Sequence, residues 1–179
     1  AGIEPDWIVG TSIGAINAAL IAGNRKQDRL AKVRSFWERV SHPDRVDMEQ
    51  VSDSQRRSNI TFSTIHAVLN GVPGFFTPRW FNGFAFGWPV APECASFYDT
   101  TELRNTLAEL VDFDYLNSTA SIRLTINAVN VATGQLTHFD SRAMQLAPDH
   151  VRASGSLPPA FPPVRIDGQL YWDGGLYSN

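Results

Sequence analysis

The sequence lacks features that stabilise several common classes of protein or direct them to a membrane or out of the cell. It contains one cysteine, Cys94, among 179 residues, so no disulfide can form within the chain and the fold must be stable without one. No apolar run reaches the length of about 18 residues that a membrane-spanning helix needs, and no signal peptide is visible from Ala1 onward. We therefore favour a cytoplasmic or peripheral membrane location.

Positive charge is also scarce. The chain has 15 Lys and Arg residues against 18 Asp and Glu residues, which gives a net charge of -3. Binding to nucleic acid depends on a basic surface that displaces counterions from the phosphates, so this balance argues against a nucleic-acid partner. No His, Cys or carboxylate residues are grouped at metal-ligand spacing, and we expect neither a metal nor a cofactor. The apolar content of 43% suits one globular domain with a substantial core.

The most informative stretch is "IVGTSIGAINAAL", residues 8–20. The apolar run at 6–9 predicts a buried strand, and the apolar residues after position 12 recur at helical spacing. Between them lies a Gly-x-Ser-x-Gly step in which Gly10 and Gly14 flank Ser12. A nucleophilic serine needs a sharp strand-to-helix turn that projects its oxygen, and small flanking residues permit that turn. The pattern predicts that Ser12 is a nucleophile at the positive end of a helix dipole.

The remainder of the chain predicts an α/β fold with a mostly parallel or mixed central sheet, the mixed form being favoured because two late hairpins must be antiparallel. We expect one domain over residues 1–179. The predicted elements are a helix over 30–40, a polar loop over 41–60, a short helix within 61–70, a helix capped by Asp99 or Thr100, strands over 121–131 and 135–139 joined at Thr133-Gly134, a short helix over 149–153, and a hairpin around Asp167-Gly168.

A serine hydroxyl needs a base, and the histidines do not supply an obvious one. The α/β-hydrolase order along the chain is serine, then acid, then histidine. The last histidine, His150, precedes the most motif-like acid, Asp173, so this order does not fit unless a catalytic histidine lies beyond Asn179. The four histidines are otherwise compatible with exposed or locally bonded positions: His42, His66, His138 and His150.

Asp173 is the better candidate for the base. It follows the apolar run "QLYW" and precedes Gly174-Gly175, where the backbone can turn sharply and approach another segment closely. Carboxylates at strand ends are where α/β active sites collect. Taken alone, the residue is also compatible with an ordinary turn aspartate whose side chain caps the loop.

The two motifs together resemble the patatin-like phospholipase family. "GTSIG" at 10–14 and "YWDGG" at 171–175 carry the resemblance, and it extends over 2–23 and 153–179. It implies a three-layer α/β/α fold, as in patatins and cytosolic phospholipase A2 catalytic domains. It also implies that Ser12 is the nucleophile and Asp173 its base, in a serine lipid acyl hydrolase that cleaves carboxylic esters of phospholipids and related lipids through an acyl-enzyme, without a cofactor.

The sequence departs from the family in one respect. Patatin-like enzymes carry a glycine-rich loop upstream of the serine, and its backbone N–H groups form the oxyanion hole. No glycine-rich stretch precedes Ser12, and "GVPG" at 71–74 is misplaced and contains a proline, which has no N–H. We therefore expect a segment of a catalytic domain that is incomplete at its N-terminus, where the oxyanion loop is missing, and at its C-terminus.

The segment 72–90 bears on the substrate. It contains seven aromatic residues and few charges, so it could form an apolar lip that meets acyl chains or a membrane interface, or it could pack in the core or against another part of the protein. A lipid ester is the favoured substrate. The alternatives are a polyester hydrolase of the polyhydroxyalkanoate type on the same pair, and a non-catalytic lipid- or protein-binding module. Acyl transfer by a Ser-His pair is disfavoured by the histidine positions.

Overall fold

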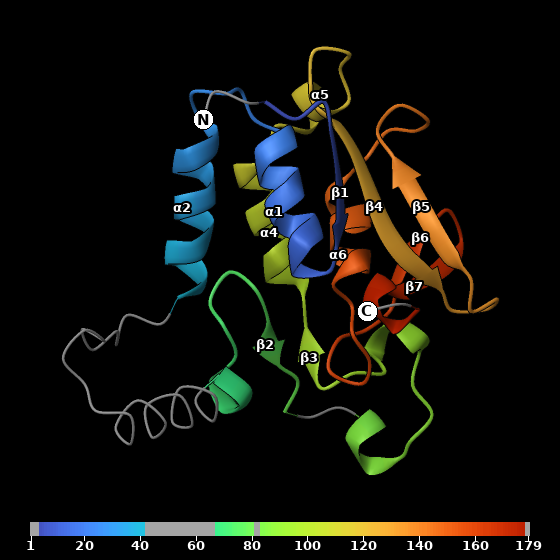
Figure 1. Ribbon diagram of the computed structural model, residues 1–179. Helices are drawn as coiled ribbons and strands as arrows, with labels where there is room; N and C mark the ends of the chain where they lie inside the picture. Colours follow the sequence, from blue (N-terminus) through green and yellow to red (C-terminus); the bar gives the residue numbers. More distant parts are fainter. Residues whose placement is uncertain (1–3, 42–66, 81–82, 178–179) are drawn as a thin grey trace, which may run out of the picture.

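The computed structural model describes residues 4–41, 67–80 and 83–177 (Figure 1). The predicted loop over 41–60 and the first part of the predicted helix over 61–70 lie almost entirely outside these residues. In chain order the elements are β1 (Trp7–Thr11), α1 (Ile13–Ala22), α2 (Arg29–Val40), β2 (Thr77–Pro78), η2 (Gly83–Phe86), η3 (Pro92–Cys94), β3 (Tyr98–Asp99), α4 (Thr101–Leu110), α5 (Phe113–Leu116), β4 (Arg123–Asn130), β5 (Leu136–Asp140), α6 (Pro148–Ser154), β6 (Val164–Ile166), β7 (Gln169–Asp173) and η4 (Gly174–Leu176).

The main sheet is mixed and is organised around β4. β1 pairs with β4 in parallel, whereas β5 and β7 pair with it antiparallel and β6 extends the sheet beyond β7. Ala128 and Val129 pair with both β5 and β7, and Asn127 pairs with both β5 and β1, so β1 and β7 share one edge of β4. They run toward each other along that edge. Their carboxyl ends therefore meet at neighbouring positions, with Thr11 opposite Asn127 and Asp173 opposite Ala128.

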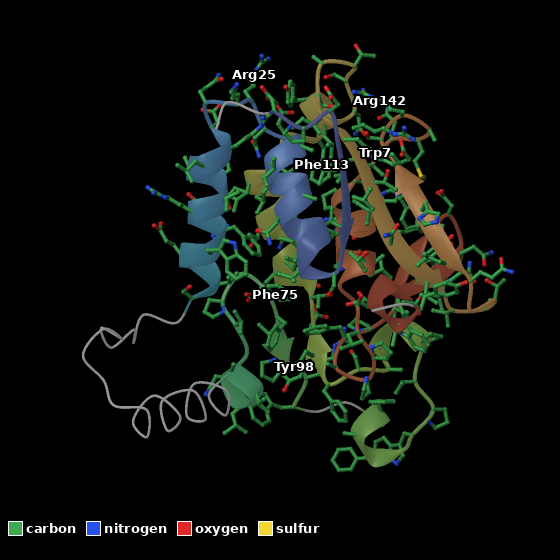
Figure 2. All side chains as sticks on the ribbon, in the orientation of Figure 1. Trp7, Arg25, Phe75, Tyr98, Phe113 and Arg142 are labelled. Carbon is green, nitrogen blue, oxygen red and sulfur yellow. The ribbon has the colours of Figure 1, made fainter. Side chains whose placement is uncertain are left out.

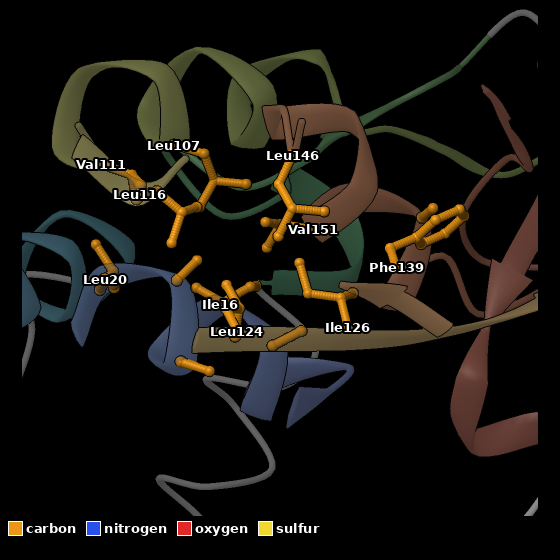
Figure 3. Close-up of a cluster of buried hydrophobic side chains, with 14 of the residues drawn as sticks. Ile16, Leu20, Leu107, Val111, Leu116, Leu124, Ile126, Phe139, Leu146 and Val151 are labelled. Atoms are coloured by element: carbon orange, nitrogen blue, oxygen red, sulfur yellow. The ribbon is translucent and has the colours of Figure 1, made fainter. Parts of the chain in front are cut away.

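The core lies between this sheet and the helices α1, α4 and α6. Leu124 and Ile126 of β4 are fully buried and face Ile16 of α1 and Val151 of α6 (Figure 3). Leu107 of α4 points into the cluster from the side opposite β4 (Figure 3). An α/β fold with a mixed sheet and flanking helices, as predicted from the sequence, is confirmed.

The opposite face of the sheet is more exposed. The run at 6–9 was expected to be a buried strand, yet Trp7 and Val9 are 53% and 55% exposed, so that prediction is wrong for the outward side of β1. Trp7 lies against the sheet (Figure 2), donates its indole N–H to Thr125 Oγ1 at 2.9 Å, and is covered by the Arg123 guanidinium 4.5 Å from its ring. Within the described residues, the packed helices lie on the other side.

The local signals for several elements are confirmed. The hairpin between β6 and β7 turns at Asp167 and Gly168, whose φ values of 47° and 80° are those of a type I′ turn. Helix α4 follows Thr100, and the Asp99 carboxylate accepts the Thr101 N–H at 2.7 Å. No helix in the described part of the chain is both long and apolar enough to cross a bilayer.

The aromatic segment divides into two parts. Phe75 and Tyr98 lie below α4 (Figure 2), and with Phe76 and Phe161 they form a cluster of rings whose contacting centroids are 4.8–6.1 Å apart. Phe75 also contacts the buried Phe36 of α2, with the ring centroids 6.4 Å apart. A second part projects outward, since its largest side chains are 65–69% exposed: Trp80, Phe86 and Trp88. Core packing therefore accounts for the first part only.

Candidate active site

Ser12 occupies a sharp turn between β1 and α1. Its backbone has φ 54° and ψ -128°, a region that a non-glycine residue rarely adopts. Gly10 makes the turn possible, because a Cβ there would lie 2.6 Å from Ala15 Cα. Gly14 differs: no described atom lies within 4 Å of the position that its Cβ would occupy. The steric requirement predicted for both glycines is therefore found at Gly10 alone among the described residues.

Asp173 lies beside Ser12, although 161 positions separate them in the sequence. The Ser12 hydroxyl donates to Asp173 Oδ2 at 2.6 Å. The proximity follows from the sheet, because β1 and β7 converge on β4 from opposite directions and end at adjacent residues. Asp173 pairs with the buried Ala128, so its side chain points to the helix-covered side of the sheet, where only 4% of it is exposed.

The Asp173 carboxylate is fixed by the turn that follows it. Its Oδ1 accepts the Gly175 N–H at 2.8 Å, and the Asp173 N–H donates to the Ser156 carbonyl at 3.0 Å. Gly174 lies against β4, since a Cβ there would lie 2.6 Å from the Asn127 oxygen. The capping role considered for an ordinary turn aspartate is thus present, and it leaves Oδ2 directed at Ser12.

Sequence reasoning did not identify Ser154, the last residue of α6. Its Oγ accepts the Ser12 N–H at 2.9 Å and donates to the Asn127 carbonyl at 2.7 Å, and the residue is fully buried. The signal in the sequence is weak, because a serine near a helix end usually caps or faces solvent.

The described histidines lie apart from the serine. His138 bonds to Asn127 Oδ1 at 2.7 Å on the outward face of the sheet, and Asn127 Nδ2 donates to Thr11 Oγ1. His150 is buried in α6, where its Nδ1 accepts the Ala147 N–H at 2.9 Å and its ring meets Phe139 edge-on. Burial lowers the pKa of His150. His42 and His66 lie outside the described residues.

Several exposed apolar side chains lie close in sequence to the residues of the site. Ile13 comes directly after Ser12, Leu157 comes after Ser156, and Leu176 and Tyr177 come after the turn at Asp173. All four are large and 44–60% exposed. Among the described residues, no group of three or more His, Cys, Asp or Glu side chains is arranged to hold a metal ion. The site therefore presents one hydroxyl and one carboxylate beside exposed apolar surface.

The whole chain, residues 1–179, matches the family model described as "Patatin-like phospholipase". The chain belongs to the patatin-like phospholipase family. The resemblance carried by the two motifs is confirmed.

Two further comparisons bear on this patatin-like chain. The crystal structure of VipD from Legionella pneumophila is similar over 96% of the chain, with 15% sequence identity and a TM-score of 0.43. The match covers 40% of VipD, so the chain spans less than half the length of that protein. No curated protein sequence matches the chain.

Proposed function

We propose that this chain carries the catalytic centre of a serine lipid acyl hydrolase that works through a Ser12–Asp173 pair. The observation that supports the proposal is the 2.6 Å hydrogen bond from the Ser12 hydroxyl to Asp173 Oδ2, on a strained turn that projects the serine oxygen. Neither described histidine bonds to either member of the pair through its side chain.

In the first half of the reaction, Ser12 Oγ attacks the carbonyl carbon of the ester. The hydroxyl proton passes to Asp173 Oδ2 as the new Oγ–C bond forms. Collapse of the tetrahedral intermediate breaks the bond to the leaving alcohol oxygen, which takes that proton. The acyl group remains on Ser12.

In the second half, water attacks the acyl-enzyme. Asp173 accepts one proton of the water, the Ser12–acyl bond breaks, and the proton returns to Ser12 Oγ. The products are a carboxylic acid and the alcohol released earlier. Asp173 can serve both steps without reorienting, because Gly175 holds its other oxygen.

A carboxylate is a weak base for an alcohol, so the developing oxyanion must be strongly stabilised. The first N–H groups of a helix are not used by its own hydrogen-bond ladder. We assign the N–H of Ile13, at the start of α1, as one donor to the oxyanion, since the residue after the nucleophile supplies such a donor in serine elbows of this type.

The apolar surface around the pair supports an acyl chain as the bound group. Ile13, Leu157, Leu176 and Tyr177 are exposed close to the polar residues in sequence, and long acyl chains bury such surface favourably. The exposed side chains of Trp80, Phe86 and Trp88 extend the apolar character, which supports peripheral contact with a lipid surface. We propose lipid esters as substrates and no nucleic-acid partner.

A fluorophosphonate probe on the full-length protein tests the proposal. We expect labelling of the wild type, no labelling of Ser12→Ala, and hydrolysis of phospholipid vesicles reduced by about 10³-fold or more in Asp173→Asn, because the serine loses its base. His138→Ala serves as the control and should keep full turnover. A folded full-length protein that is neither labelled nor active would refute the proposal and favour a binding module.

A further inference from the structure

We propose that Ser154 is a positioning residue for the nucleophile, an inference that rests on the proposed function of Ser12. Its hydroxyl is fully buried and makes two hydrogen bonds, accepting the Ser12 N–H at 2.9 Å and donating to the Asn127 carbonyl at 2.7 Å. These partners lie 142 and 27 positions away in the sequence. One hydroxyl thus joins α6, the serine turn and β4.

The hydrogen bond to the Ser12 N–H stabilises a residue whose backbone conformation is strained. Ser12 has a positive φ, and strain of this kind amounts to about 1–3 kcal/mol and persists only where the surroundings enforce it. A buried N–H without an acceptor would add a further penalty. Ser154 supplies that acceptor, and the direction of the Ser12 side chain depends on the backbone that it fixes.

The bond to Asn127 ties the same hydroxyl to the place where the two strands meet. Thr11 pairs with Asn127, and Gly174 packs against the Asn127 carbonyl, which accepts the hydrogen bond from the Ser154 hydroxyl. Ser154 therefore sets the serine turn relative to β4, and β4 in turn locates Asp173. The distance between Ser12 Oγ and Asp173 Oδ2 is fixed through this contact.

The same hydrogen bond determines which backbone N–H groups of the turn can contact the substrate. Because the Ser12 N–H is committed to Ser154, it is not free to meet the substrate oxygen. Within the turn, the Ile13 N–H is the next amide after Ser12, and it is the one that we assign as a donor. Ser12 therefore supplies the attacking hydroxyl, and its own N–H does not stabilise the charge on the substrate oxygen.

Another buried serine provides a matched control. Ser141 Oγ accepts the Leu124 N–H at 3.0 Å, so it also satisfies a backbone amide of the sheet region from a buried position. It contacts neither Ser12 nor Asp173 through its side chain. Ser141→Ala should therefore lose a comparable hydrogen bond without moving the proposed pair.

The experiment compares Ser154→Ala, Ser154→Cys and Ser141→Ala in the full-length protein. For Ser154→Ala we expect kcat on a phospholipid or soluble ester to fall by about 10–10²-fold with KM changed by less than about threefold, and fluorophosphonate labelling to slow in proportion. Ser154→Cys, which keeps a weaker hydrogen-bonding group of similar size, should give an intermediate kcat. Ser141→Ala should also lower Tm, by no more than Ser154→Ala, while keeping the wild-type kcat.

Two results would overturn the inference. Wild-type kcat and labelling rate in folded Ser154→Ala would show that the contact does not position Ser12, and the proposed function would stand. An equal loss of kcat in Ser154→Ala and Ser141→Ala would reduce Ser154 to a general structural role. If Ser154→Ala does not fold, the Ser154→Cys variant decides, since its kcat must fall with its Tm matched to that of Ser141→Ala. Absence of labelling in the wild type would overturn both proposals together.

Discussion

Ser12 and Asp173 lie 2.6 Å apart, but they are held there by different physical means. Ser12 has a positive φ, in a turn so tight that a Cβ at Gly10 would lie 2.6 Å from Ala15 Cα. Asp173 has φ -52° and ψ 130°, an ordinary backbone conformation, and hydrogen bonds from Gly175 and to Ser156 orient it. We call residues 10–15 the serine arm and residues 173–175 the aspartate arm. Each has a glycine packed against backbone and a hydrogen bond to another segment, but the backbone strain lies at Ser12 and not at Asp173.

The difference explains why one arm was easier to predict than the other. A position where a Cβ does not fit must be glycine, so the serine turn can be recognised in the sequence from a five-residue pattern. Hydrogen bonds to backbone groups leave no such mark, and "DGG" alone fits any tight turn. The aspartate could be selected only through its combination with the serine motif.

The substitution Gly10→Ala in the serine arm should give the largest loss of stability and of labelling. In Gly10→Ala the new Cβ meets Ala15 Cα at 2.6 Å and Ala15 N at 2.8 Å, and neither backbone atom can move without opening the turn. We expect the free energy of unfolding to fall by about 3 kcal/mol or more and fluorophosphonate labelling to be lost. Urea denaturation with single-dose labelling checks both; a labelled variant of wild-type stability would contradict the steric account.

The same carbon on the aspartate arm should have a smaller effect. In Gly174→Ala the Cβ would lie 2.6 Å from the Asn127 oxygen and 3.0 Å from Thr11 Cγ2. We expect about 1–3 kcal/mol of destabilisation, because this turn is less strained and can shift. The shift displaces Asp173, and kcat should fall by about 10²-fold. Stability loss without any loss of kcat would mean that the turn does not set the carboxylate.

Acid should lower the stability of the fold through a buried histidine in α6. Burial lowers the pKa of His150 in α6 below its ordinary value of 6.5. As pH falls through 6.5, the unfolded chain takes up a proton that the folded chain does not, so stability falls. We expect Tm to drop between about pH 7.5 and about pH 5.5, and less so in His150→Asn, which cannot titrate there. Equal slopes in the two proteins would contradict this assignment.

The smallest effect should come from the second motif glycine. No described atom lies within 4 Å of a Cβ at Gly14, which sits in the first turn of α1. Alanine has a higher helix propensity by about 1 kcal/mol. Gly14→Ala should therefore leave the free energy of unfolding unchanged or raise it by up to about 1 kcal/mol. Destabilisation comparable to that of Gly10→Ala would show that both glycines are sterically required.

Much of the fold could be predicted from local patterns. The turn residues at Asp167-Gly168 and the periodicity of 13–22 specify their elements directly. What the sequence could not supply is the position of β7 on the same edge of β4 as β1, which depends on pairings more than 40 residues apart. Ser154 was missed for the same reason, since its partners come from two distant segments. The exposure of Trp7 was misjudged because an apolar run does not reveal which side is covered.

The positive φ at Ser12 has a cost in stability as well as a use in the site. Glycine would remove the strain of about 1–3 kcal/mol at that position, while its greater chain freedom would take back only about 0.5–1 kcal/mol. Ser12→Gly would also remove the hydrogen bond to the buried Asp173 carboxylate, which costs about 1–3 kcal/mol. We therefore expect a variant that cannot catalyse the reaction and whose Tm stays close to that of the active form. The reactive oxygen is thus held at the cost of strain in the backbone that carries it.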